Sequence, residues 1–195
     1  AILANLDGFV GARIISNNPI VLNNGSWNGS VCDYDDGQDI GIDQSVPVNE
    51  LGTEYILIKG NGNSEVEKPI IIATEDNTEV NVNGTYYGNL NAGDHFLIPT
   101  SYYSPNDNMY VNTTKRVYCY QALAGGNDNV TAGLNFIPPI SCFMPKKVDM
   151  IPEIEKIGTT SFSGGVTIFT TVGATVTVED EGSGTITYVP AMADP

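Results

Sequence analysis

The sequence is poor in cations. Its 195 residues include eight Lys and Arg against 23 Asp and Glu, which gives a net charge of −15. Nucleic acids and anionic membranes are both bound through clustered cations. The composition therefore argues against these two classes of partner. It fits an extracellular protein, or one that binds divalent cations.

Histidine and cysteine are also scarce, with one histidine and three cysteines. There is no Cys-x-x-Cys pair and no cysteine near His95, so a zinc site is not expected. Asp94 precedes His95 in a strand-like segment, where adjacent side chains point to opposite faces, so it is badly placed to orient a general base. The G-x-S-x-G, P-loop and H-E-x-x-H motifs are missing as well. We therefore expect a protein that is not an enzyme.

Long hydrophobic runs are missing too. No run approaches 18 apolar residues, so the sequence predicts no membrane insertion. Apolar residues still make up 41% of the chain, which is enough for a folded protein. The chain starts without Met in apolar sequence and stops just after a strand-like run. We interpret it as a fragment of a longer polypeptide, whose targeting signal would lie elsewhere.

Short strands dominate the sequence. Segments rich in Val, Ile, Thr and Tyr alternate with Asn, Asp, Gly and Pro, and convincing helical spacing is missing. Asn83-Gly84 is the strongest hairpin dipeptide. The expected strands are residues 12–15, 20–23, 54–59, 69–73, 79–82, 94–98, 109–112, 117–122, 166–170, 175–179 and 185–189. This pattern predicts an all-β fold.

Two pairs of segments resemble each other at offsets of 97 and 96 residues. The first match pairs residues 12–23 with 109–120, and the second pairs 78–82 with 174–178. They predict two tandem, similar β-sandwich units with little or no helix, residues 1–100 and 101–195, with the boundary in the turn-rich segment 100–108. The alternative is that Val/Thr alternation resembles itself in any β protein.

The three cysteines divide into two kinds of site. Cys119 lies in the apolar run 117–120, where a buried free thiol is common. Cys32 and Cys142 lie in loop-like sequence, and we predict a disulfide between them that links the two units in an oxidising compartment. It would close a loop of over a hundred residues and stabilise the protein by about 4 kcal/mol in the chain-entropy description.

The densest acidic segment is residues 33–39, DYDDGQD. Calcium binds several hard oxygens on a loop in which glycine permits a tight bend. The calcium ligands would be the four aspartates of the segment, Asp33, Asp35, Asp36 and Asp39. The full EF-hand spacing is not met and no glutamate closes the loop, so a solvated acidic loop is the alternative.

Aromatic side chains in polar segments are the candidate contact residues. Trp27 lies in a polar, loop-like stretch, where it is either a platform for a sugar or partner, or a plug at the end of the core. Tyr86-Tyr87 and Tyr102-Tyr103 are also expected in loops, with one residue of each pair packed inward and the other exposed. Loops at the ends of a sandwich can vary without disturbing the core, so we expect contacts there.

Several short motifs occur in a recognisable order along nearly the whole chain, from Gly8 to Val189. They are residues 11–20 (GARIISNNPI), Asp43-Gln44 followed by Pro47, residues 52–55 (GTEY), residues 73–80 (ATEDNTEV) and Pro138-Pro139. This order resembles the N-terminal domain of the IgG Fc-binding protein family. It is most similar to bacterial versions found in very large surface proteins of Bacteroidota, including gliding-motility adhesins.

The resemblance implies a cell-surface or secreted module without catalytic residues. It does not imply immunoglobulin binding, because that activity belongs to the animal protein. One departure is Arg116, where the second turn usually has proline, and this change alters the turn without requiring another fold.

We therefore expect a non-enzymatic module of a long extracellular or cell-surface protein, acting in adhesion or as a stalk spacer. Its expected partners are neighbouring modules of the same chain and a surface polysaccharide or another protein, and calcium is the one cofactor considered. The alternative is a carbohydrate-binding domain or a carbohydrate-active enzyme, because 23 acidic residues allow many carboxylate pairs.

Overall fold

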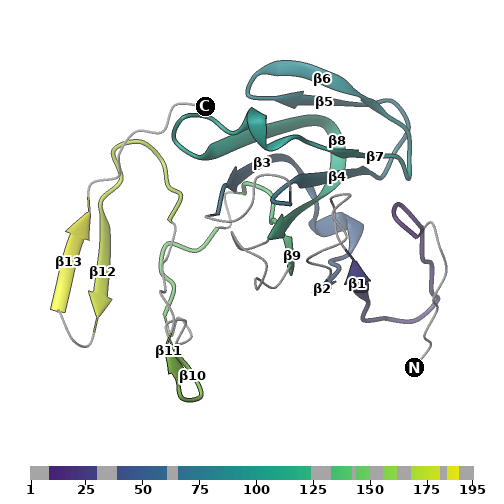
Figure 1. Ribbon diagram of the computed structural model, residues 1–195. Helices are drawn as coiled ribbons and strands as arrows, with labels where there is room; N and C mark the ends of the chain where they lie inside the picture. Colours follow the sequence, from purple (N-terminus) through teal and green to yellow (C-terminus); the bar gives the residue numbers. More distant parts are fainter. Residues whose placement is uncertain are drawn as a thin grey trace. The chain divides into compact units, whose positions relative to one another are not determined.

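Nearly all the regular structure of this protein is β-strand. The computed structural model describes residues 9–29, 39–60, 66–123, 133–141, 144–149, 156–161, 168–180 and 184–188. Within these ranges the only helical elements are two 3-10 turns, η1 (Val48–Glu50) and η2 (Thr100–Tyr102) (Figure 1). The predicted all-β fold is confirmed. No helix in the described part of the chain is long and apolar enough to cross a membrane.

The chain divides into two compact units, residues 1–142 and 143–194. In the second unit the described strands form two antiparallel hairpins. One hairpin joins β10 (Lys156–Ile157) to β11 (Thr160–Ser161), and the other joins β12 (Val176–Asp180) to β13 (Gly184–Tyr188). In the first unit, β1 (Asn23–Gly29) pairs with β2 (Asp39–Gln44), and seven further strands form one sheet.

The centre of that sheet is the 16-residue strand β8 (Asn108–Leu123), which is paired along both edges. One edge meets β5 (Thr78–Val82) and β4 (Pro69–Ala73), and the other meets β3 (Gly52–Ile58) and β9 (Gly133–Phe136). β6 (Thr85–Leu90) extends the sheet beyond β5, and β7 (His95–Leu97) extends it beyond β4. All of these pairings are antiparallel.

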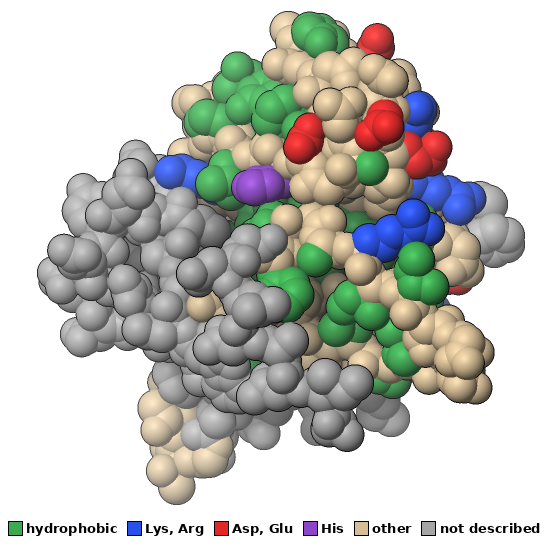
Figure 2. All heavy atoms as spheres, turned by 90° about the vertical axis from the view of Figure 1, so that its right-hand side faces the viewer, with side chains coloured by type: hydrophobic (Ala, Val, Ile, Leu, Met, Phe, Trp, Pro, Cys, Tyr) green, Lys and Arg blue, Asp and Glu red, His purple; other side chains and the backbone are tan. Residues whose placement is uncertain are grey.

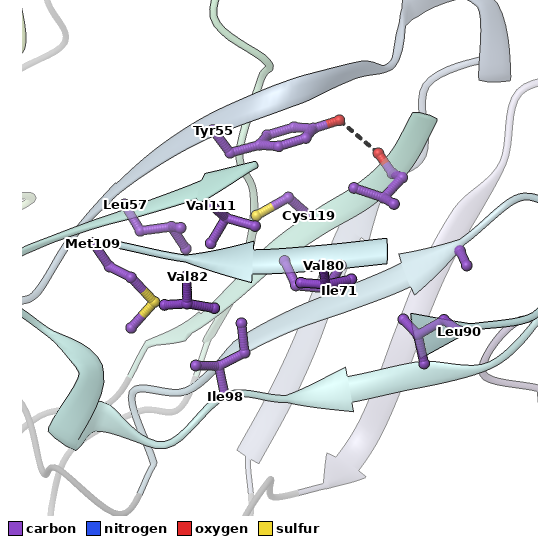
Figure 3. Close-up of a cluster of buried hydrophobic side chains, with 12 residues drawn as sticks. Tyr55, Leu57, Ile71, Val80, Val82, Leu90, Ile98, Met109, Val111 and Cys119 are labelled. Atoms are coloured by element: carbon purple, nitrogen blue, oxygen red, sulfur yellow. Dashed lines mark hydrogen bonds between the residues drawn. The ribbon is translucent and has the colours of Figure 1, made fainter. Parts of the chain in front are cut away.

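The core lies on the inward face of this curled sheet. Alternate residues of each strand point inward, as the two-residue period of a strand requires. β8 contributes four of them to the cluster, Met109, Val111, Val117 and Cys119, all fully buried (Figure 3). The rest of the buried cluster comes from β3, β4, β5 and β6 and the segment after β7: Tyr55, Leu57, Ile71, Ala73, Val80, Val82, Leu90 and Ile98.

One polar group inside the core is tied to the central strand. The Tyr55 hydroxyl, on β3, donates a hydrogen bond to the Val117 carbonyl of β8 at 2.6 Å, and it accepts one from the Gly52 N–H at 3.1 Å. Burial raises the pKa of Tyr55 well above its ordinary value, so the hydroxyl stays protonated and keeps its donor.

The expected boundary between two units near residue 100 is not seen, because one sheet contains strands from both sides of that position. β8 needs partners on both of its edges, and three of the four come from earlier in the chain. The division between the compact units falls after Cys142 instead.

Two pairs of similar segments led to the expected repeat. The segments of the first pair differ in structure, and those of the second pair are alike. Ile20 is exposed and outside any strand, whereas Val117 is buried in β8. Val80 and Val176, by contrast, both lie in hairpins, β5–β6 and β12–β13. The tandem arrangement of two similar sandwiches is therefore not confirmed.

Several predicted residues lie outside the described part of the chain. Cys32 and Cys142 are among them, so their disulfide stays a prediction, while Cys119 is a buried free thiol as expected. Asp33, Asp35 and Asp36 also lie outside it. Only the backbone of Asp39, at the start of β2, and of Trp27, within β1, is described.

Candidate contact surface

A β-bulge in β6 decides where two of the predicted contact residues point. Val80 of β5 lies opposite Gly88, and Asn81 lies opposite Tyr86, which leaves Tyr87 as the extra residue. A bulge re-aims the side chains beside it. Tyr86 accordingly faces outward with 60% of its surface exposed, whereas Tyr87 packs against the core. The sequence indicated loops here, but both residues belong to a strand.

Tyr87 is the centre of an aromatic group that we call the tyrosine cluster: Tyr87, Phe96 and Tyr102. Its ring meets Phe96 of β7 edge-on at a centroid distance of 5.1 Å, and Tyr102 of η2 edge-on at 5.3 Å. Each such pair contributes about 1 kcal/mol beyond the area that it buries. The cluster therefore brings together β6 and β7, the two ends of the strand path through the sheet.

Tyr102 is held at the surface by its backbone as well as by its ring. The Asn83 side-chain amide, from the hairpin that joins β5 and β6, donates to the Tyr102 carbonyl at 2.6 Å. The Tyr102 side chain remains 39% exposed. A large amphipathic side chain is thus presented on a fixed support, which is the property that contact residues need.

The neighbouring Tyr103 turns the other way. Its side chain packs against the core and its hydroxyl is buried. Burial raises the pKa of Tyr103, and the nearby Glu67 carboxylate raises it further. Each tyrosine pair thus has one inward and one outward member, as expected. Tyr103 itself offers no hydroxyl to a partner in this conformation.

The other candidate side chains are metal-ligating residues, His95 and exposed hydrophobic residues. Within the described residues there is no group of three or more His, Cys, Asp and Glu that could hold a metal ion. His95 lies in β7 as expected and is exposed. On the face drawn in Figure 2, exposed hydrophobic side chains form separate groups among polar and charged ones.

The four tyrosines could be selected from the sequence, but their spatial arrangement could not: Tyr86, Tyr87, Tyr102 and Tyr103. The structure joins Tyr87 to Tyr102 and puts Tyr86 on the outer face of the sheet. It also adds Phe96, which sequence reasoning missed. Alternation placed Phe96 in a strand, but its contact with Tyr87 depends on how the two ends of the sheet meet.

Some residues of the motifs noted in the sequence make contacts that hold the fold together. Gly52 packs so closely on Pro139 that a Cβ at Gly52 would lie 2.5 Å from the Pro139 Cβ. In the turn between β4 and β5, the Thr74 hydroxyl donates to the Arg116 carbonyl and the Thr78 hydroxyl donates to the Glu75 carbonyl, both at 2.7 Å. Gly52, Thr74 and Thr78 therefore each have a role in the fold.

The comparison with protein families gives one result. A family model described as IgGFc binding protein matches residues 2–193, nearly the whole chain. No curated protein and no solved structure gives a significant match. The family is of a binding type and is typically extracellular, and the match confirms the resemblance that the motifs indicated.

Proposed function

Because this chain belongs to the IgGFc-binding protein family, we propose that it is a non-enzymatic module of a large extracellular or cell-surface protein, acting in adhesion. A role as a stalk spacer between neighbouring modules of the same chain is compatible with this function. By analogy with the bacterial members that the motifs resemble, the parent protein is a surface adhesin of the kind used in gliding motility.

The observation that carries the proposal is the rigid display of tyrosines. Tyr86 projects from a paired strand, and Tyr102 is fixed by its ring contact with Tyr87 and by Asn83. Tyrosine contributes a large contact area at a low cost in conformational entropy. Tyrosine is also among the residues that are enriched in interfaces.

The sheet supports a load-bearing role as well. β8 is hydrogen-bonded along both edges, to four other strands. A strand held on both sides cannot leave the sheet without breaking both ladders together. A module built this way suits a chain that is pulled while it holds a surface.

The experiment combines binding with turnover. The purified chain is immobilised on beads, which are incubated on surfaces coated with polysaccharides or with extracellular proteins, and it is also assayed against generic glycoside and peptide substrates. We expect adhesion that heat-unfolded chain does not give, and no turnover. Turnover that disappears on substitution of a single carboxylate would contradict the proposal and favour a carbohydrate-active enzyme.

A further inference from the structure

Four side chains form a row across the outer face of the sheet, opposite the core. Tyr86 of β6 lies directly opposite Asn81 of β5, Asn81 lies opposite Asn112 of β8, and Asn112 lies opposite Glu54 of β3. We call these four residues the outer row. Because neighbouring strands lie about 4.8 Å apart, the row extends for about 14 Å.

The strand period directs the whole row away from the core. The residues beside Asn81 in β5, Val80 and Val82, are buried, as are Val111 of β8 and Tyr55 of β3. Adjacent residues of a strand face opposite sides. Tyr86 and Glu54 are accordingly exposed, and Asn81 and Asn112 are half-buried between them.

The carboxylate end of the row is already oriented. The Tyr110 hydroxyl donates to Glu54 Oε1 at 2.6 Å, and this bond is the largest cause of the raised pKa of Tyr110. Asn112 also hydrogen-bonds Tyr110. A carboxylate has about four acceptor positions, so Glu54 can still accept hydrogen bonds from a ligand.

The middle of the row offers both donors and acceptors. The Asn81 carboxamide is half-buried and lies between Tyr86 and Asn112 in the middle of the row. A carboxamide carries two N–H donors and one acceptor oxygen. With the Tyr86 ring at one end, the row thus combines an aromatic surface, two amides and a carboxylate.

We propose that the outer row binds a neutral oligosaccharide that lies across the strands. A sugar has an apolar ring face, which suits the Tyr86 ring, and hydroxyls that both donate and accept, which suit Asn81, Asn112 and Glu54. The proposal rests on the function given above and names the ligand of one part of its contact surface.

The negative charge and the polar composition of this face favour a neutral sugar over an anionic polysaccharide or a protein. Glu54 lies in the row, Glu79 is exposed on the same face of β5, and the whole chain carries a charge of −15. An anionic polysaccharide would be repelled by these carboxylates. A protein partner would need an apolar centre, because charged residues are depleted at the cores of interfaces, and the row has a single aromatic residue.

The test is a titration of the intact chain with short, uncharged oligosaccharides of glucose, xylose, mannose and N-acetylglucosamine, followed by calorimetry or NMR. An oligogalacturonate is titrated in parallel as an anionic probe. We expect at least one neutral oligosaccharide to bind and the anionic one not to bind. Tyr86→Ala should weaken the neutral ligand about tenfold, the effect of losing one good aromatic contact.

Two further variants separate the row from the rest of the surface. Glu54→Gln keeps the shape and removes the charge, and should also weaken binding. Phe169→Ala removes an exposed aromatic side chain that belongs neither to the row nor to the tyrosine cluster, and should leave oligosaccharide binding unchanged. Melting curves of all three variants should match that of the unaltered chain, because each change is at an exposed side chain.

Several outcomes would overturn the inference. They are binding of the anionic probe alone, neutral binding that survives Tyr86→Ala, and neutral binding that is lost in Phe169→Ala. If no neutral oligosaccharide binds while beads carrying the chain still adhere to protein-coated surfaces, the outer row is not the ligand site and the adhesive function stands. Absence of adhesion to every surface would instead count against the function itself.

Discussion

Replacing Tyr55 with phenylalanine tests whether β3 and β8 are joined in the way that the structure indicates. The substitution keeps the ring, which is fully buried, and removes one oxygen. The Val117 carbonyl then loses a donor at 2.6 Å, and the Gly52 N–H loses an acceptor at 3.1 Å. Both partner groups belong to the backbone, so they cannot move far to find new partners.

The magnitude follows from those two lost bonds. A buried group that is left unsatisfied costs about 1–3 kcal/mol, so we expect Tyr55→Phe to lower the free energy of unfolding by about 2 kcal/mol. For a protein of this size, that corresponds to a fall of about 4–8 °C in the melting temperature.

Urea unfolding followed by circular dichroism measures the difference directly. The midpoint should fall while the slope with denaturant stays the same, because the surface exposed on unfolding is unchanged. Tyr86→Phe removes an equivalent hydroxyl from an exposed ring, and should change the free energy of unfolding by less than about 0.5 kcal/mol. Equal stabilities for the two variants would refute the hydrogen-bond argument.

Three more predictions concern titration, the cysteines and calcium. Tyr55 has a raised pKa in the folded state and about 10 when unfolded, so its contribution to stability is complete below pH 10 and is lost as the pH rises beyond it; alkaline melting curves should show this loss, and Tyr55→Phe should weaken it. If Cys32 and Cys142 form a disulfide, a reductant or Cys32→Ser should destabilise the oxidised protein by about 4 kcal/mol, and two free thiols per molecule beyond Cys119 in the unfolded, unreduced protein would exclude the bond. If residues 33–39 bind calcium, a chelator should lower the melting temperature and calcium should restore it, whereas an unchanged curve would leave a solvated loop.

The strands of the central sheet were predictable because their alternation is set by the core. Residues 69–73 and 79–82 were expected as strands and lie within β4 and β5. The segments 109–112 and 117–122 were expected as two strands and are parts of the single strand β8. The polar residues between them indicated a turn. They instead lie in an irregularity of the β3–β8 pairing, where Glu54 of β3 lies opposite Asn112 and Gly52 lies opposite Val117.

Other elements could not be read from local sequence. β1 is polar (NNGSWNG), and this composition indicates a loop. The segment is a strand because it pairs with β2, which lies later in the chain. Residues 12–15 have the apolar character of a strand, yet Ile15 is 77% exposed and no described strand pairs with them.

The geometry of the candidate surface depends on pairing between distant segments. Tyrosines could be selected from sequence, and the rule that one of each pair faces inward holds for both pairs. The bulge that turns Tyr87 inward exists only through the register of β5 and β6. The outer row needs the registers of four strands at once, which no single segment encodes.

The most direct test of the adhesive function is the force needed to detach beads that carry the chain from a surface to which they adhere. The measurement compares the unaltered chain with the double variant Tyr86→Ala and Tyr102→Ala, after melting curves have established that the variant is folded. The exposed tyrosines should supply most of the contact, so the double variant should detach at a clearly lower force. Equal detachment forces for the two proteins would contradict the claim that this surface makes the contact.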